Sequence, residues 1–255
     1  MLISCLSPTY NRYPRLPFLL EEAVECFLRQ DHADKELLIC NDTPGQTLVF
    51  DHPQVRVLNV PERFPSLGLK LRHMIELASG DLLCRWDDDD LSLPHRLSYS
   101  AARLGSNLEW RAANHWFDDG HRLREVTRPG NTHLMSLWRR EVLDRLDGYP
   151  TFPLGGEDQA FNSGLARAGI APRDGGDVLR PDEIFYVYRW NTGSQHLSGR
   201  SDGGDNPHLP HWEAIGRQPI VRGTFRIEPR IRDSSRERME RVRCETIQTS
   251  LTAIL

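Results

Sequence analysis

The chain has 255 residues, of which 38% are hydrophobic, and this is enough to bury the core of one large domain or two small ones. Its formal net charge of −4 comes from acidic and basic residues of mixed order, so no overall basic field would attract nucleic acid. The five cysteines have no CxxC spacing, which argues against a zinc site and a disulfide framework and indicates reduced thiols.

Apolar runs alternate with amphipathic segments in the first ninety residues. The run at 2–7 ends at Pro8 and predicts a strand, and 18–30 then places its apolar residues on one helical face. A further helix is predicted over 68–78. Three more strands are predicted in this region, at 36–40, 55–60 and 81–86. This alternation predicts a parallel α/β sheet with helices on its faces.

The pattern is looser after residue 90. Pro94 suits the first turn of a helix that runs to about Leu104, where its missing N–H costs nothing. Four later elements are predicted: a hairpin of 110–117 and 121–127 around Asp118-Asp119-Gly120, helices over 138–146 and 157–168, and a last strand at 184–190. Together these segments predict one domain over residues 1–198.

Residues 199–255 are expected to form a C-terminal extension. Its first part is rich in Gly, Ser, Asp, His and Pro, which indicates a loop, and a helix is predicted from about 234 to 251. The arginines of this tail could contact a membrane surface, although interleaved acids favour a solvated, self-paired face. With no membrane-spanning run and no signal-peptide pattern, the expected location is cytoplasmic.

Four carboxylates, Asp87 to Asp90, follow directly after the strand predicted at 81–86. Like charges at this spacing repel, so a nearby cation would favour their ionisation. In an extended segment Asp87 and Asp89 project to one side, and oxygen ligands suit Mg²⁺ or Mn²⁺. A solvated acidic turn is the alternative. The run's place at the C-terminal end of a strand, where open α/β sheets bind ligands, favours the metal site.

Two polar loops are expected at the same sheet edge. Pro8-Thr9-Tyr10-Asn11-Arg12 follows the first strand, and Asn41-Asp42-Thr43-Pro44-Gly45 follows the second. Asp42 could accept a hydrogen bond from a nucleobase N–H, and Arg12 could pair with phosphate. Each loop alone indicates only a turn, but with the carboxylates they predict a nucleotide pocket.

In their order and spacing these motifs resemble those of the family-2 glycosyltransferases with the GT-A fold, over roughly residues 2–198. The matching segments are the loop Pro8–Arg12, Asn41-Asp42, the helix leading from Gly68 to Gly80, the Asp-x-Asp-Asp signature Asp87–Leu91 with Pro94 after it, and the Glu-Asp motif Gly155-Gly156-Glu157-Asp158. The resemblance implies a mixed, mainly parallel sheet flanked by helices.

The resemblance also implies an inverting, metal-assisted transfer of a sugar from a nucleotide-diphosphate donor to an acceptor hydroxyl, with UDP the favoured nucleotide. Expected donor contacts come from Pro8, Thr9, Tyr10, Asn11, Arg12, Asp42, Arg72, Asp87 and Asp88. Asp89, Asp87 and His196 are the expected ligands of Mn²⁺ or Mg²⁺, and Asp158 is the expected general base, with Glu157 next.

Two details of this assignment rest on side-chain chemistry. Of the basic residues on the 68–78 helix, Arg72 is expected to bind phosphate, because a guanidinium can do so bidentately, and Lys70 is expected at the surface. Glu157 and Asp158 could also serve only to cap a helix N-terminus. The sugar and the acceptor stay open.

Two other classes of function remain. A metal-dependent nucleotidyltransferase would use the same carboxylates and release pyrophosphate. A non-catalytic nucleotide-sugar-binding protein would need no base, so the Glu157-Asp158 pair counts against it.

Overall fold

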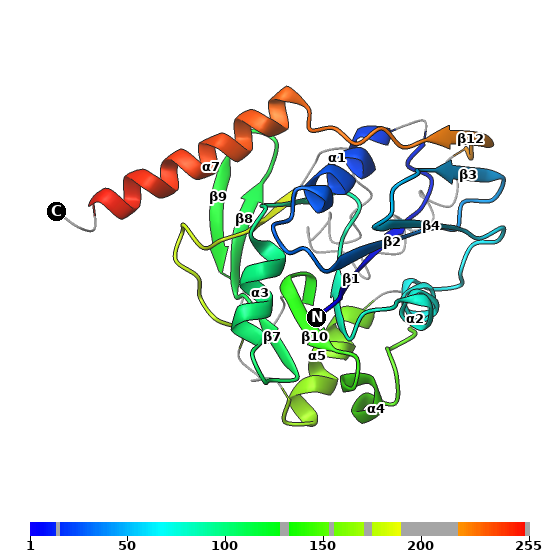
Figure 1. Cartoon of the computed structure of the whole chain (residues 1–255), viewed down its shortest axis with the longest axis horizontal. Coiled ribbons are helices and arrows are strands. Elements are labelled where there is room, and N and C mark those ends of the chain that lie inside the picture. Colours follow the sequence, from blue (N-terminus) through cyan, green and yellow to red (C-terminus); the bar gives the residue numbers. More distant parts are fainter. Residues whose placement is uncertain (14–15, 128–132, 153–155, 171–174, 190–218, 253–255) are drawn as a thin grey trace, which may run out of the picture.

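The structure is a computed structural model of the chain that describes residues 1–13, 16–127, 133–152, 156–170, 175–189 and 219–252; the side chains of 245–252 lie outside its description. At its centre is a six-stranded sheet in the order β4-β2-β1-β5-β10-β7, with helices on both faces (Figure 1). Its strands are β1 (Ile3–Thr9), β2 (Lys35–Asn41), β4 (Val55–Asn59), β5 (Leu82–Arg85), β7 (Glu109–Arg111) and β10 (Ser136–Arg139). Strands β4, β2, β1 and β5 are parallel, whereas β10 is antiparallel to both β5 and β7, so the predicted mixed, mainly parallel sheet is confirmed.

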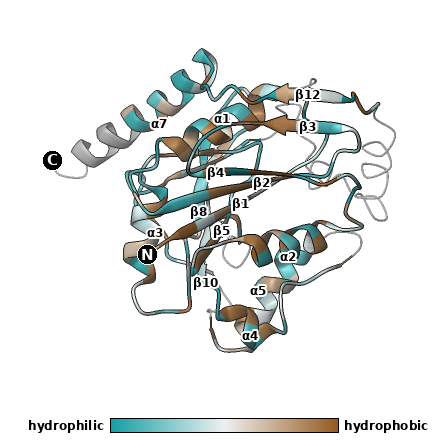
Figure 2. Cartoon of the chain, turned by 45° about the vertical axis from the view of Figure 1, so that its right-hand side comes forward, coloured by the Kyte–Doolittle hydropathy of each residue, from teal (hydrophilic) through white to brown (hydrophobic). Residues whose placement is uncertain are grey.

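Two hydrophobic clusters cover the two faces of this sheet. Successive side chains of a strand point to opposite faces, so Cys5 and Leu6 of β1 belong to different clusters. Both faces are apolar because both are buried, as expected for parallel strands, and Figure 2 shows β1 and β2 as largely hydrophobic ribbons. Cys5, Cys40 and Cys84 are buried in these clusters as small core residues, with free thiols.

Six helices flank the described sheets. They are α1 (Pro17–Leu28), α2 (Leu67–Leu77), α3 (Arg96–Leu104), α4 (Val142–Leu146), α5 (Glu157–Arg167) and α7 (Asp233–Thr252), with a 3-10 turn η1 (His133–Met135). Buried residues of α1 and α3 belong to one cluster, and those of α2, α4 and α5 to the other. Ser66 caps α2 by accepting a hydrogen bond from the Leu69 N–H at 3.2 Å. The predicted helices over 18–30, 68–78, 157–168 and 234–251 are confirmed.

The start of α2 lies against the chain that leads into α5. A side chain at Gly68 would place its Cβ only 2.1 Å from the carbonyl oxygen of Pro150, so glycine alone fits there. This close approach brings α2 and the Glu157 end of α5 to the same side of the sheet.

Two smaller sheets complete the fold. The first has the order β6-β11-β8-β9, from β6 (Leu91–Ser92), β11 (Tyr186–Arg189), β8 (Asn114–Asp118) and β9 (Leu123–Thr127). The predicted hairpin around Asp118-Asp119-Gly120 is confirmed as β8–β9. The second pairs β12 (Gly223–Arg226) in parallel with β3 (Gln46–Val49), so a strand of the C-terminal extension joins an N-terminal one.

Three predicted elements differ from the structure. Trp138 lies in strand β10 and pairs with Leu83 and Glu109, so the helix predicted over 138–146 begins only at Val142; pairing with β5 and β7 outweighs local preference. The strand predicted at 184–190 is confirmed as β11, but it is not the last, because β12 follows it. The helix predicted from Pro94 begins at Arg96.

The loop predicted from 198 to about 210 lies outside the described residues. Among the helices that are described, none combines the length and the hydrophobicity needed to cross a membrane.

Candidate active site

Three loops meet at the C-terminal edge of β2, β1 and β5. Asn11 adopts a left-handed backbone with φ of 53°, which asparagine tolerates better than most residues. In this conformation its N–H donates to the hydroxyl of Thr43 at 2.7 Å and joins the first two loops. Arg12 reaches the acidic run after β5. The predicted convergence of the three polar segments is therefore found in the structure.

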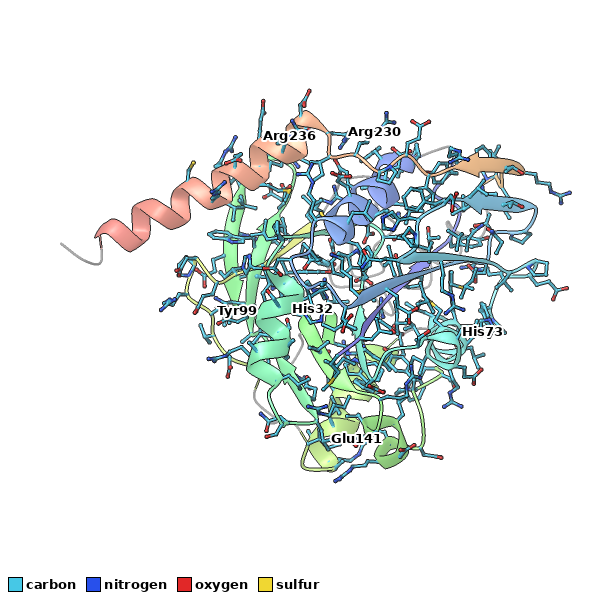
Figure 3. All side chains as sticks on the ribbon, in the orientation of Figure 1. His32, His73, Tyr99, Glu141, Arg230 and Arg236 are labelled. Carbon is cyan, nitrogen blue, oxygen red and sulfur yellow. The ribbon has the colours of Figure 1, made fainter. Side chains whose placement is uncertain are left out.

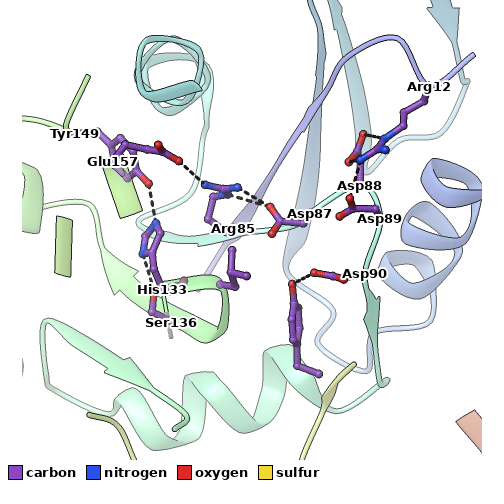
Figure 4. A network of polar contacts seen from close by, with 12 residues as sticks. Arg12, Arg85, Asp87, Asp88, Asp89, Asp90, His133, Ser136, Tyr149 and Glu157 are labelled. Carbon is purple, nitrogen blue, oxygen red and sulfur yellow. Dashed lines mark hydrogen bonds and ion pairs between the residues drawn. The ribbon is translucent and has the colours of Figure 1, made fainter. Parts of the chain in front are cut away.

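The acidic run forms a turn, and its carboxylates divide among several partners, with Asp88 and Asp89 sharing one of them (Figure 4). Arg85 donates to Asp87 at 2.7 Å. Arg12 binds Asp88 through Nε and Nη2 at 2.8 and 2.6 Å, and the same Nη2 donates to Asp89 at 2.8 Å. The extended conformation expected for Asp87–Asp89 is wrong, because the backbone turns at Asp88 and Asp89.

Asp90, the last residue of the run, anchors the turn to β11. Its two oxygens accept the Tyr186 hydroxyl at 2.6 Å and the Arg189 backbone N–H at 2.7 Å. Arg189 also donates through Nε to the Asp89 carbonyl. The turn is thus held both from its carboxylates and from its backbone.

Lys70 is buried, and the expectation of a surface position for it is wrong. Its Nζ donates to Asp42 at 2.6 Å and to the Thr9 carbonyl at 2.7 Å, and only 4% of the residue is exposed. The other Asp42 oxygen accepts the Phe64 N–H at 3.0 Å. Asp42 is therefore fixed at the sheet edge by an ammonium group and a backbone N–H.

Arg72 points to a different place. Its Nε and Nη2 donate to the Tyr149 carbonyl at 3.2 and 2.8 Å. On the same helix, two positions earlier, Lys70 contacts the first loop, so the two side chains occupy different faces of α2. A phosphate contact by Arg72 stays a prediction.

The other residues of the first loop border the same edge. Pro8 and Thr9 are the last residues of β1, paired with Cys40 and Asn41 of β2. Tyr10 follows them, and the Arg63 guanidinium lies 4.2 Å from the centre of its ring.

Glu157 begins α5 and faces the end of β5. Its carboxylate lies 3.7 Å from Nη1 of Arg85, whose other nitrogens bind Asp87. Burial raises the pKa of Glu157, the Arg85 guanidinium opposes this shift, and the carboxylates of Asp158 and Asp87 add to it. Asp158, the next residue, is half-buried, and its carboxylate accepts the adjacent Gln159 N–H at 2.8 Å.

Arg85 therefore connects the acidic turn to the Glu157-Asp158 pair. Its place in the site was not predicted from the sequence. The side chain stands at the end of a buried strand and is only 8% exposed although it is charged. A charged residue inside an otherwise apolar strand segment, DLLCRW, is the signal that could have identified it, since buried charges need partners.

His133, Tyr149 and Ser136 form a buried group of polar side chains next to Arg85. The His133 ring has its Nε2 atom 2.7 Å from the Tyr149 hydroxyl, and the Ser136 hydroxyl donates to the His133 carbonyl at 2.8 Å (Figure 4). Burial lowers the pKa of His133 well below its ordinary value, and the charges of Arg85 and Arg111 lower it further. His133 is therefore neutral at the base of the site.

The donor set was compared with what a divalent ion requires. Within the described ranges, no three His, Cys, Asp or Glu side chains gather in a way that could hold a metal. Oxygens of Asp88 and Asp89 do converge on one cationic atom, Nη2 of Arg12, at 2.6 and 2.8 Å. Mg²⁺ is commonly held by one or two carboxylates plus substrate phosphates, so these residues fit an ion that arrives with a diphosphate. His196 lies outside the described residues.

A family model and a curated relative each match part of the chain. Residues 4–109 match the family model described as Glycosyl transferase family 2. The chain is 33% identical over 99 residues to the putative glycosyltransferase EpsE of Bacillus subtilis (strain 168), a match that covers 36% of each protein. The chain thus spans about a third of the length of this relative.

Solved structures share the fold. S. aureus TarS 1–349, in a complex with UDP-GlcNAc, is 17% identical over 84% of this chain and 65% of its own, with a TM-score of 0.58. The mannosyltransferase PcManGT from Pyrobaculum calidifontis, in a complex with GDP-Man and Mn²⁺, is 16% identical over 84% of this chain and 70% of its own, with a TM-score of 0.51. Residues 4–109 of this chain thus resemble the Glycosyl transferase family 2 model, and the described fold resembles that of these two solved glycosyltransferases.

Proposed function

We propose that the chain is an inverting glycosyltransferase that moves a sugar from a nucleotide-diphosphate donor to an acceptor hydroxyl, with UDP as the favoured nucleotide. The observation that carries the proposal is the meeting of Arg12, the acidic turn 87–90 and the Asp42–Lys70 pair at one sheet edge. TarS has been solved with UDP and with UDP-GlcNAc, which supports a uridine nucleotide as the donor.

The donor would lie across the first loop and the acidic turn. The fixed carboxylate of Asp42 is suited to accept a hydrogen bond from the base, next to Tyr10. Arg12 binds the acidic turn through Nε and Nη2, while its buried Nη1 has no hydrogen-bond partner among the described residues. That N–H group can donate to a phosphate oxygen. Asp88 supports Arg12 in this role through its two-point contact.

Asp89, with Asp87, is the proposed metal-binding pair, and His196 is the proposed third ligand. Bound Mn²⁺ or Mg²⁺ would neutralise the negative charge that builds on the departing diphosphate. Arg85 donates to Asp87 at 2.7 Å and fixes the direction of its carboxylate. The complex of PcManGT with Mn²⁺ supports the choice of metal.

Asp158 is the proposed general base. Glu157 is buried against Arg85, whereas Asp158 is half-buried at the first turn of α5 and closer to solvent. A carboxylate placed there can remove the proton of an acceptor hydroxyl as the hydroxyl attacks the anomeric carbon. The nucleoside diphosphate leaves from the opposite side, and the configuration at that carbon inverts.

The experiment is a thermal-shift screen of nucleoside diphosphates and nucleotide sugars, with manganese and with a chelator. A ligand present at a hundred times its Kd stabilises the folded protein by about 2.7 kcal/mol. We expect UDP and UDP-sugars with manganese to raise the melting temperature. No shift with any nucleotide would contradict the proposal.

Product analysis then separates the other functions. A glycosyltransferase releases UDP from the UDP-sugar, and water can replace the acceptor in a slow hydrolysis. Pyrophosphate released from a nucleoside triphosphate would identify a nucleotidyltransferase instead. Binding without any release of UDP in the presence of a range of acceptors would identify a non-catalytic binder.

A further inference from the structure

Glu22 on α1 has a carboxylate that is completely buried between two arginines from later parts of the chain. One oxygen pairs with Nη1 of Arg189, at the end of β11. The other accepts the backbone N–H of Arg232 at 2.9 Å and lies 3.6 Å from that residue's Nε. An unpaired charge at this depth would be strongly unfavourable, so Glu22 and its partners stabilise one another.

Arg189 connects Glu22 to the acidic turn. Its Nε donates to the Asp89 carbonyl, and its backbone N–H donates to Asp90 at 2.7 Å. Only 1% of Arg189 is exposed, so its position is set by these contacts and not by solvent. Tyr186, on the same strand, holds the other Asp90 oxygen at 2.6 Å. The Arg189 guanidinium that Glu22 binds is therefore also in contact with the backbone of the turn.

The segment between β12 and α7 covers Glu22 from outside. Ile231 is buried there, and the Arg232 guanidinium lies 3.6 Å from the centre of the Phe18 ring on α1. Arg230 binds the neighbouring carboxylate, Glu21, at 3.0 Å, and Figure 3 shows it beside α1. The C-terminal extension thus contacts α1 at two adjacent acids, Glu21 and Glu22. Of these two, Glu22 is the one that binds Arg189 and through it contacts the acidic turn.

We propose that Glu22 and Arg189 are positioning residues for the acidic turn, and that residues 227–232 of the C-terminal extension complete this support by capping Glu22. The inference rests on the proposed function, because the donor would bind at that turn. It gives the extension a role in the site: the contacts run from Arg232 through Glu22 and Arg189 to the backbone of Asp89.

The test compares Glu22→Gln with Glu21→Gln. The two acids are neighbours on one helix and are almost equally buried, at 0% and 3% exposed, but Glu21 contacts Tyr13 and Arg230 instead of Arg189. Hydrogen exchange is measured without any ligand. We expect amides of residues 86–92 to exchange about tenfold faster in Glu22→Gln, as for the loss of one charged hydrogen bond, and at the wild-type rate in Glu21→Gln.

A second readout is the manganese concentration needed for half-maximal UDP binding, measured by calorimetry. It should rise by about tenfold in Glu22→Gln, as for other residues that orient metal ligands, and stay unchanged in Glu21→Gln. If Glu22→Gln does not fold, Glu22→Asp keeps the buried charge and shortens its reach, with Glu21→Asp as the control. On the extension, Arg232→Gln should accelerate the same amides more than Arg230→Gln does.

The outcomes separate the two proposals. Equal exchange of residues 86–92 in the Glu22 and Glu21 variants would overturn the positioning role, whatever the protein binds. Faster exchange in the Glu22 variant of a protein that binds no nucleotide would support the positioning role and overturn the proposed function.

Discussion

The neutral state of His133 should make the protein sensitive to acid. Its ring is 1% exposed, packs against Phe161 with 4.8 Å between ring centroids, and lies 2.7 Å from the Tyr149 hydroxyl. Burial and the charges of Arg85 and Arg111 hold its pKa well below 6.5 in the folded protein. In the unfolded chain the same group titrates near 6.5.

The sign and the size of the effect follow from proton binding. As the pH falls below 6.5, the unfolded state takes up a proton that the folded state does not, so the free energy of unfolding decreases. One proton changes this free energy by at most about 1.4 kcal/mol per pH unit. Between pH 8 and pH 5 the contribution of His133 to stability should therefore fall, by at most about 2 kcal/mol.

The assay is urea unfolding of the wild type and of His133→Gln at pH 8 and pH 5. Glutamine is neutral at both values and can still contact Tyr149, so the variant should lack this part of the pH dependence. The stability difference between the two proteins should shift in favour of the variant at pH 5, by at most about 2 kcal/mol. Tyr149→Phe is the control, because it removes the contact but keeps the histidine. Parallel pH profiles for wild type and His133→Gln would refute the reasoning.

Three further predictions concern the site. Asp89→Asn should weaken UDP binding in manganese, and equal UDP affinity of the wild type in manganese and in chelator would contradict metal-assisted binding. Asp158→Asn should lower turnover by roughly 10²–10⁴-fold while UDP affinity and melting temperature stay near wild type; normal turnover would move the base elsewhere, with Glu157 next. Lys70→Met should destabilise the fold by about 3–5 kcal/mol in urea unfolding, because it leaves Asp42 as a buried, unpaired charge. A loss below about 1 kcal/mol, as is usual for a surface pair, would show that the Lys70 contact adds little.

Short-range patterns identified most of the elements and the location of the site. The apolar runs of β1, β2 and β5 are continuous because these strands are buried on both faces, and the polar residues that follow them mark the sheet edge. Strands β3 and β12 escaped the sequence analysis. They pair with each other across more than 170 residues, and each is short and partly exposed.

The directions of individual side chains could not be predicted from the sequence pattern. Lys70 was expected at the surface of α2, yet it is buried against Asp42. The contact of Arg72 with the Tyr149 carbonyl was not predicted either. The partner in each case comes from a segment at least 28 residues away. Spacing along one helix fixes which residues share a face, but not what that face meets.

Hydrophobic period and chain order were enough to predict the fold class, the order of the main strands and helices, and the edge where the site lies. They could not predict how the four carboxylates of the acidic turn divide between Arg12, Arg85 and Arg189, because Arg12 and Arg189 come from distant parts of the chain. Only the tertiary structure joined the C-terminal extension to Glu22. The position of a buried charge depends on its partners, and the fold brings these partners together from distant segments. A local sequence pattern does not indicate which distant residue will be the partner.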